Sequence, residues 1–506
     1  MPRQTALLIA LLALPAAAAE VRFDGSYRLR FNGDTNLLLD EKGYPSGQKS
    51  WFEHRLRLTP KIVEIGDQGG AEIQSSFDIV SGEFAGDVAS DFRGYGVTER
   101  SVRNGFNAAG FDFRHLFAAV NAPFGILEIG QMPNQWGMGM VANSGNGENT
   151  SDFGDARYGD IVERLLFATR PLLGVLSPKS DFAREFSMAV AGDLVYRDRY
   201  AELLVRNGGG VQWGDIAWQI LGAAVYAPAE GSRLGLYVTR RIQNYASGGG
   251  DLHIWTFDLY ARHAQPLGTS FVLSLEAEAA EVYGGTSHAP NLTAPGTTHI
   301  SQQGAAVRAG LLRTFFEAEV EGGYASGDAN PFDDHSNRFQ MNRDYKVGLV
   351  LFDQVLMFQS QNAARRLSDP KLFGRPLPGL DLIPTEGAVT NALYVKPTLR
   401  FKPGFLGGSL HLVGSALFAW APQPLVDPYH ALVNSSALNA YGDGAGKNYG
   451  VELDAAITYA QRIAGKAGFD VGFQFGYLFP GSAFDRADGS SMPGVSATRV
   501  RATFLF

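Results

Sequence analysis

The sequence contains no cysteine in 506 residues, only 19% of its residues are charged, and beyond residue 19 it has no long apolar run. The missing cysteines exclude a disulfide scaffold and a cysteine-ligated metal centre. A membrane-spanning helix needs about 20 apolar residues in succession, so a bundle of such helices is excluded as well. The net charge of −8 lacks the basic excess of nucleic-acid-binding proteins, and we expect no nucleic-acid partner.

Residues 1–19 have the layout of a signal peptide. A basic start precedes an apolar core, Ala6–Leu14, and the small residues Ala17, Ala18 and Ala19 end the segment. The apolar core is too short to cross about 30 Å of hydrocarbon. We therefore expect cleavage after Ala19 and export of the mature chain to the bacterial envelope.

Most of the remaining chain alternates apolar and polar residues. Near the start, Tyr27, Leu29 and Phe31 share one face of a predicted strand, whereas Arg28 and Arg30 share the other. Similar segments recur to the C-terminus, and no helix-period segment is long enough to cover so many one-sided strands. We infer that lipid covers the apolar faces, as in an all-β, transmembrane antiparallel β-barrel of the bacterial outer membrane.

The connections predict the number of strands. Both chain ends should lie on the periplasmic side, which requires an even number, with short periplasmic turns and long extracellular loops. Nineteen segments are candidates, and the rule holds if residues 325–387 form one large extracellular loop containing a helix at 347–366 across the mouth. We predict eighteen strands, with sixteen as the alternative, in one domain spanning residues 20–506.

Inward-facing charges provide the functional argument. When the barrel closes, its last strand pairs with the first strand, which also pairs with the second. The arginines of these three strands should therefore gather on one wall of the lumen, with glutamates on the opposite wall. Opposed walls create a transverse field that orients polar or ionic solutes. The alternative is that these charges pair with one another and seal the barrel. The predicted pore-lining residues are Arg28, Arg30, Arg55, Arg57, Arg499 and Arg501 on the basic wall, and Glu276, Glu278, Glu317, Glu319 and Glu321 on the acidic wall.

The segment Gly130–Met140 is rich in glycine and methionine and follows a predicted strand directly. Folded inward, it would narrow the pore with Gln135 and Trp136, whose amide and aromatic groups suit polar and sugar-like solutes. Packed against its neighbours, it would be an ordinary outer loop. The sequence leaves both arrangements open.

The chain ends inside a predicted strand, residues 496–506, whose last residue is Phe506. This ending resembles the C-terminal aromatic signal that the outer-membrane assembly machinery recognises in bacterial barrel proteins. We therefore expect two kinds of partner besides the solute: outer-membrane lipid and the barrel-assembly machinery.

Three short stretches resemble segments of the alginate-export family of outer-membrane porins. They are Tyr324–Asp328 (YASGD), Asn448–Asp454 (NYGVELD) and Phe479–Gly481 (FPG), and the paired arginines near the mature start look like that family's opening hairpin. The resemblance implies an eighteen-strand channel with a basic lumen that passes an anionic polysaccharide. The stretch after Asp328 departs from the family pattern, which leaves the solute open.

Together these features predict a porin-like channel for passive diffusion or export of a polar or anionic solute, including an oligo- or polysaccharide. The competing class is a non-conducting barrel that acts in adhesion or envelope structure through its loops. The nine histidines fall in no catalytic motif, so we expect no enzyme activity, no catalytic residue, no metal site and no cofactor. The oligomeric state is open.

Overall fold

The computed structural model describes residues 20–36, 48–66, 69–86, 112–146, 152–154, 158–176, 179–201, 204–207, 210–213, 215–246, 250–292, 296–374 and 377–506. The predicted signal peptide, residues 1–19, lies outside the described residues.

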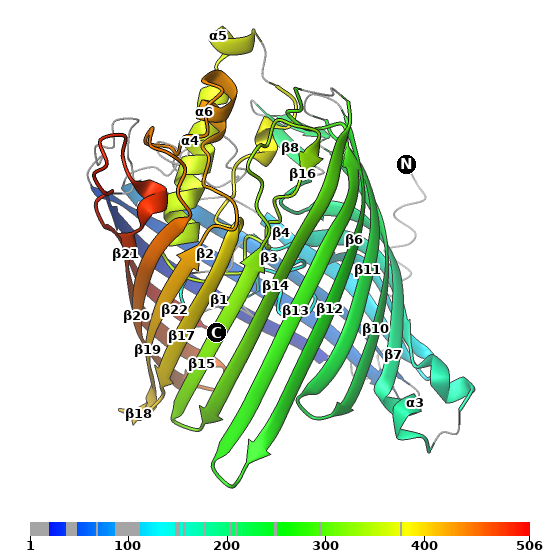
Figure 1. The fold of residues 1–506 in the computed structure, drawn as a ribbon. Coiled ribbons are helices and arrows are strands. Elements are labelled where there is room, and N and C mark those ends of the chain that lie inside the picture. Colours follow the sequence, from blue (N-terminus) through cyan, green and yellow to red (C-terminus); the bar gives the residue numbers. More distant parts are fainter. Residues whose placement is uncertain are drawn as a thin grey trace.

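Within these residues, eighteen long strands form an antiparallel sheet that closes on itself (Figure 1). Sequential long strands pair, and the first also pairs with the last, so the wall has no free edge. The predicted eighteen-strand β-barrel is confirmed, and the sixteen-strand alternative is wrong. The strands are β1 (Glu20–Thr35), β2 (Gln48–Gly66), β3 (Gly69–Gly86), β4 (Asp112–Ala122), β5 (Gly125–Pro133), β6 (Ile161–Thr169), β7 (Phe186–Arg197), β10 (Ile216–Ala229), β11 (Ser232–Asn244), β12 (Asp251–Leu267), β13 (Phe271–Thr286), β14 (Thr298–Arg313), β15 (Phe316–Ala325), β17 (Ala392–Phe401), β19 (Gly408–Trp420), β20 (Asn448–Ala464), β21 (Ala467–Pro480) and β22 (Val495–Leu505).

Shorter elements lie in the connections. The short strands are β8 (Leu204–Asn207), β9 (Gly210–Trp213), β16 (His335–Ser336) and β18 (Gly404–Phe405). The helical segments are η1 (Pro171–Gly174), α3 (Asp181–Glu185), η2 (Leu351–Leu356), α4 (Met357–Leu367), α5 (Pro370–Phe373), η3 (Leu380–Leu382), α6 (Pro428–Val433) and η4 (Ser482–Phe484). None of the helices in the described ranges has the length and apolarity needed to cross a membrane.

The alternation seen in the sequence sorts side chains between the two faces of the wall. In β17, Leu393 and Leu399 point outward and are 50% and 57% exposed, whereas Tyr394 and Lys396 point inward and are buried. The outward faces of the other strands likewise present large apolar side chains. Such an exterior is stable only in hydrocarbon, and the closed barrel satisfies its backbone without water. The protein is an integral outer-membrane protein.

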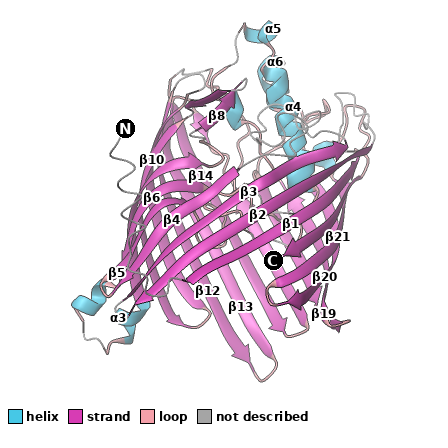
Figure 2. Cartoon of the chain, turned by 180° about the vertical axis from the view of Figure 1, so that it is seen from behind, coloured by secondary structure: helices cyan, strands magenta, loops and turns pink. Residues whose placement is uncertain are grey.

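One connection departs from the predicted alternation of short turns and long loops. Residues 170–185 join β6 to β7 at the end of the barrel where the other connections are tight, yet they contain η1 and α3 (Figures 1 and 2). The ring of Phe182 lies 5.8 Å from that of Phe186 and 5.2 Å from that of Tyr226. Because those two rings lie on outward-facing strand positions, α3 packs against the outer face of the barrel.

In the large connection between β15 and β17, residues 326–391, the described residues contain no membrane-crossing strand. The bounds predicted for this loop were 325–387. Its longest helical stretch is η2 followed by α4, residues 351–367, where the prediction was 347–366. The connection does more than lie across the mouth, because Tyr345 and Leu349 are buried among side chains that face the lumen. That this mouth faces the cell exterior stays a prediction.

The two faces of the wall should respond differently to charge. Leu259→Arg places a guanidinium on the lipid side near the middle of β12, and we expect it to lower the free energy of unfolding by about 2–4 kcal/mol. The matched control is Ser274→Arg on β13, at a lumen-facing position. Urea unfolding in phospholipid vesicles, followed by tryptophan fluorescence, measures both. Equal losses would contradict the assignment of the faces.

Candidate functional site

The predicted basic wall assembles because β22, β1 and β2 are adjacent strands. Arg28 lies opposite Arg55 in the register of β1 with β2, and Arg30 lies opposite Arg501 in the register of β1 with β22. Arg57 is two residues from Arg55 on β2, and Arg499 is two residues from Arg501 on β22, so both lie on the same inner face as their neighbours. All six predicted arginines therefore share one stretch of the lumen.

Four of these arginines are paired with carboxylates on neighbouring strands. The pairs are Arg30 with Glu53, Arg57 with Asp78 (2.7 Å), Arg499 with Asp34 (2.7 Å) and Arg501 with Asp470 (3.0 Å). Charge-assisted bonds of this kind satisfy buried guanidiniums and fix their direction. The net positive charge of the wall is therefore well below that of six arginines.

The positive excess is concentrated around Arg55. The charges that act on Arg55 include those of Arg28, Arg57 and Arg114, with Asp78 as a counter-charge. Arg55 Nε is buried and has no hydrogen-bond partner among the described residues. Arg114, on β4, is only 3% exposed and donates to the carbonyl of Ser144 (3.3 Å). A cluster of buried guanidiniums attracts anionic groups.

Arg114 is not among the residues predicted from the sequence. Simple alternation would place it on the outer face with Leu116 and Val120, which are 46% and 45% exposed. The register of β3 with β4 shifts between Ser76 and Phe77, and this irregularity breaks the alternation next to Arg114, which is buried. The tertiary pairing of β2 with β3 and of β3 with β4 was needed to bring Arg114 near Arg55.

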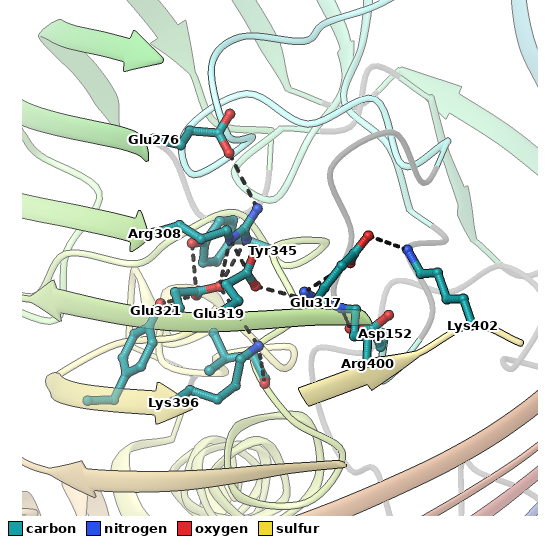
Figure 3. A network of polar contacts seen from close by, with 12 residues as sticks. Asp152, Glu276, Arg308, Glu317, Glu319, Glu321, Tyr345, Lys396, Arg400 and Lys402 are labelled. Carbon is teal, nitrogen blue, oxygen red and sulfur yellow. Dashed lines mark hydrogen bonds and ion pairs between the residues drawn. The ribbon is translucent and has the colours of Figure 1, made fainter. Parts of the chain in front are cut away.

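The predicted acidic wall is largely neutralised (Figure 3). Arg308, on β14 between the two glutamate strands, lies opposite Glu276 in one register and opposite Glu321 in the other. Its guanidinium contacts Glu321 at 2.9 Å, Glu276 at 3.5 Å and Glu319 at 3.6 Å. Direct cross-strand pairs of opposite charge stabilise a sheet. These contacts are those of the alternative stated for the sequence, in which inward-facing charges pair with one another.

A second row of bases lies on the other side of β15. Lys396 is 3.8 Å from Glu321, Arg400 is 2.9 Å from Glu319, and Lys402 is 2.6 Å from Glu317. Arg400 also reaches Asp152, at 2.6 Å, in the connection that follows β5 (Figure 3). Alternation alone places Lys396 and Arg400 on the inner face of β17, but the sequence analysis did not use it there.

The remaining predicted glutamate, Glu278, holds a loop inside the barrel. The backbone N–H groups of Met138 and Met140 donate to its carboxylate, the second at 3.1 Å. These residues belong to loop 134–160, which joins β5 to β6. Glu278 is therefore an anchor for backbone amides rather than part of an open charged wall.

Loop 134–160 starts inward, which is one of the two arrangements considered for Gly130–Met140. The ring of Trp136 stacks on Tyr237 at 5.2 Å, and its Nε1 donates to Asp258 at 3.2 Å. Gln135 accepts a hydrogen bond from the backbone N–H of Ser144, 2.8 Å away. Gln135 thus braces its own loop, while Trp136 lies against the inner wall.

The connection between β15 and β17, here called loop 326–391, has a similar anchor. Glu452, on β20, is fully buried and accepts hydrogen bonds from the backbone N–H groups of Leu349 (2.6 Å), Val350 (2.8 Å) and Leu351 (2.7 Å). Lys396 Nζ donates to the carbonyl of Val347 at 3.0 Å. Glu452 lies in one of the stretches that resembled the alginate-export family, but its backbone partners cannot be inferred from residue types.

The two loops also bind each other inside the barrel. The backbone N–H of Asn342 donates to the carbonyl of Met140, and its side-chain Nδ2 donates to Asp160, both at 2.6 Å. Asp344 accepts from the N–H of Gly159 at 2.7 Å. Between them the loops bury a large apolar cluster in the lumen. The two loops therefore make the lumen narrower than the eighteen-strand wall alone would leave it.

Cavities lined by described residues border these loops. A narrow one of about 30 Å³ lies beside the basic wall, and it has room for roughly one or two water molecules. It is lined on its basic side by Arg30, Arg499, Arg501 and Lys346, and on its acidic side by Glu53 and Asp353. A larger cavity of about 290 Å³ lies nearer the loop end of the barrel.

Comparison with known proteins places the fold. No protein-family model and no curated protein sequence matches the chain. Among solved structures, Pseudomonas aeruginosa OccK9 (OpdG) aligns with a TM-score of 0.51 at 11% identity, over 96% of this chain and 98% of that one. P. aeruginosa OccK1 (OpdK) aligns with a TM-score of 0.51 at 12% identity over the same shares. The structure of P. aeruginosa OpdK with vanillate aligns with a TM-score of 0.50 at 11% identity, again over 96% and 98%.

At such identities the similarity establishes the fold, and function has to be argued from the site. The alignments support a porin-like barrel and do not single out the alginate-export family. In fold, this chain is similar to the Pseudomonas channels along nearly its whole length.

Proposed function

We propose that the protein is a porin-like outer-membrane channel for small organic anions, with its loop end facing the cell exterior. The observation that carries this proposal is the cluster of inward-facing arginines around Arg55, beside a passage narrowed by two anchored loops. Arginine is permanently charged and forks onto carboxylates, so a row of such groups offers successive contacts to a passing anion. Transport by diffusion needs no cofactor and no turnover.

The similarity to OpdK adds support for the size of the solute. That protein was crystallised with vanillate, which is a small organic anion, and its barrel has the same fold. The resemblance to the alginate-export family implied an anionic polysaccharide instead. The narrow space beside Arg30 and Arg501 favours the smaller solute, because a chain of linked sugars requires a larger displacement of the two loops.

We propose as well that the barrel-assembly machinery recognises β22 through Phe506. The backbone of Phe506 is paired with Gly25, with N–H donation in both directions at 2.8 and 3.1 Å. The ring of Phe506 lies over Gly25, and the residue is still 44% exposed, so it has surface left for recognition.

The excess positive charge should make the channel anion-selective. In planar bilayers with a KCl gradient, we expect the reversal potential of the unmodified protein to report preference for chloride, and Arg55→Glu to shift it towards potassium. Arg365→Glu makes the same charge change on the exposed side of α4, and we expect no shift from it. The absence of unit currents from folded, unmodified protein would favour the competing class, a non-conducting barrel with an adhesive or structural role.

The anchor at Glu452 should control the width of the passage. Glu452→Ala leaves three buried N–H groups without an acceptor, at a cost of about 1–3 kcal/mol each, so we expect loop 326–391 to loosen and unit conductance to rise. Glu452→Gln retains an acceptor oxygen, and its conductance should stay closer to that of the unmodified protein. Equal conductance in all three proteins would show that this loop does not limit the current.

The ring of Phe506 should matter for assembly rather than for stability. We expect Phe506→Ala to lower the amount of folded protein in the outer membrane of cells, because the recognised ring is lost. Purified Phe506→Ala refolded in detergent should unfold at nearly the same urea concentration as the unmodified protein. The matched control is Leu505→Ala, which removes an exposed apolar side chain from the neighbouring residue. A loss in cells as large for Leu505→Ala would argue against specific recognition of Phe506.

A further inference from the structure

The cavity of about 290 Å³ is separate from the arginine cluster around Arg55. Its barrel wall comes from the loop ends of β12, β13 and β14, and loop 326–391 covers it with residues that include Arg338 and Phe339. A volume of this size is at the lower limit of small-molecule sites in proteins, which begin at about 300 Å³. It suits one compact organic molecule.

The barrel wall of this cavity carries four apolar side chains, Leu252, Ile254, Val282 and Ile300, next to the polar Thr256, Thr286, Thr298 and Gln302. Leu252 and Ile300 face inward and are 7% and 6% exposed, and Ile254 and Val282 pack with them. Phe339, from loop 326–391, lines the same space. Apolar surface that faces a cavity is stabilised by an apolar group placed against it.

Arg338 supplies positive charge to the same cavity. Its Nη2 donates to the carbonyl of Leu382 at 2.7 Å. Asp328, which lines the same cavity, acts on Arg338 as a counter-charge, but no carboxylate of a described residue lies within 4.0 Å of the guanidinium. Burial, with Arg199 beside it, lowers the pKa of Arg338 to about 10, so it is still protonated at neutral pH. A partly buried cation that no carboxylate contacts directly favours an incoming anion.

Arg199, which also lines the cavity, differs in this respect. It donates to Gln340 and to the carbonyls of Leu382 and Pro384, and it lies 3.6 Å from Glu386. These contacts hold its guanidinium within the protein. Arg338 is therefore the arginine of this cavity with bonding capacity left for a ligand.

We propose that this cavity is a binding site for an organic monoanion with a compact apolar body, the carboxylate lying at Arg338 and the body against Leu252, Ile254 and Ile300. An inorganic anion would leave the apolar wall uncovered, and a neutral apolar molecule would leave the charge of Arg338 uncompensated. The further idea that this site captures solutes before they reach the arginine cluster rests on the proposed channel function. Binding of the anion in the cavity does not depend on that function.

Equilibrium binding to the purified full-length protein in detergent tests the site without any measurement of current. Three probes are compared. Benzoate carries both a carboxylate and an apolar ring, acetate carries the carboxylate without a ring, and benzamide carries the ring without a negative charge. We expect benzoate to bind at least about tenfold more tightly than either, which corresponds to about 1.4 kcal/mol. Isothermal titration calorimetry gives the three dissociation constants.

Two variants locate the site within the barrel. We expect Arg338→Gln to weaken benzoate binding about tenfold, because it removes the charge while keeping a donor to Leu382. Val282→Thr, which makes the wall more polar at nearly constant size, should weaken benzoate binding and leave acetate binding unchanged. Arg365→Gln, an equal loss of charge elsewhere in loop 326–391, should change neither. Retention of the heat-dependent gel shift of folded barrels shows that each variant is folded.

The outcomes separate this site from the channel proposal. Benzoate binding that is equal in Arg338→Gln and in the unmodified protein would overturn the site, whatever the bilayer measurements show. Binding that depends on Arg338, in a protein that passes no current, would support the site and refute the channel. Equal affinity for benzoate and acetate would overturn the assignment of an apolar body.

Discussion

Every feature of this molecule depends on the closure of its sheet. In hydrocarbon there is no water to bond an unpaired strand edge, and each buried backbone group without a partner costs several kcal/mol. Pairing of β1 with β22 removes both edges at once. Once the sheet is closed, period-two alternation sends Leu393 to the lipid and Lys396 to the lumen. The apolar exterior and the charged interior are thus two results of one constraint.

The interior then has to satisfy its own charges. Ion pairs across neighbouring strands do part of this, as with Arg57 and Asp78 or Arg308 and Glu321. Other carboxylates, above all Glu278 and Glu452, accept backbone N–H groups from the two loops that enter the barrel. Both devices lower the net field in the lumen. The charge that is left over gathers around Arg55 and at Arg338, which is why these two places carry the functional argument.

The barrel could be predicted from the sequence because its signal is local. The faces of a strand follow from side-chain parity, and the number of strands follows from the lengths of the connections. The exception at residues 170–185 shows the limit of the second rule, because a helix that packs on the outer face through Phe182 lengthens a connection without adding a strand.

The site was less predictable because its contacts are not local. Parity places Arg30 and Arg501 inward, but it does not show that Glu53 and Asp470 compensate them, since this depends on the register between strands. The same holds for Arg308 between the glutamates. The contacts of Glu452 are harder still to predict from the sequence, because its partners are backbone N–H groups, which every residue except proline carries.

The hydrogen bonds between Glu452 and loop 326–391 have a consequence for the order in which the barrel assembles. The carboxylate and the amide of Leu349 are 103 residues apart in the chain, and between them lie the whole of β17 and β19. Contacts of such long sequence separation form late, since the chain closure they require has a large entropic cost. The strands from β15 to β20 must therefore be paired before loop 326–391 can bind Glu452. We therefore expect a newly inserted barrel to have a wider lumen until the contact between Glu452 and loop 326–391 forms.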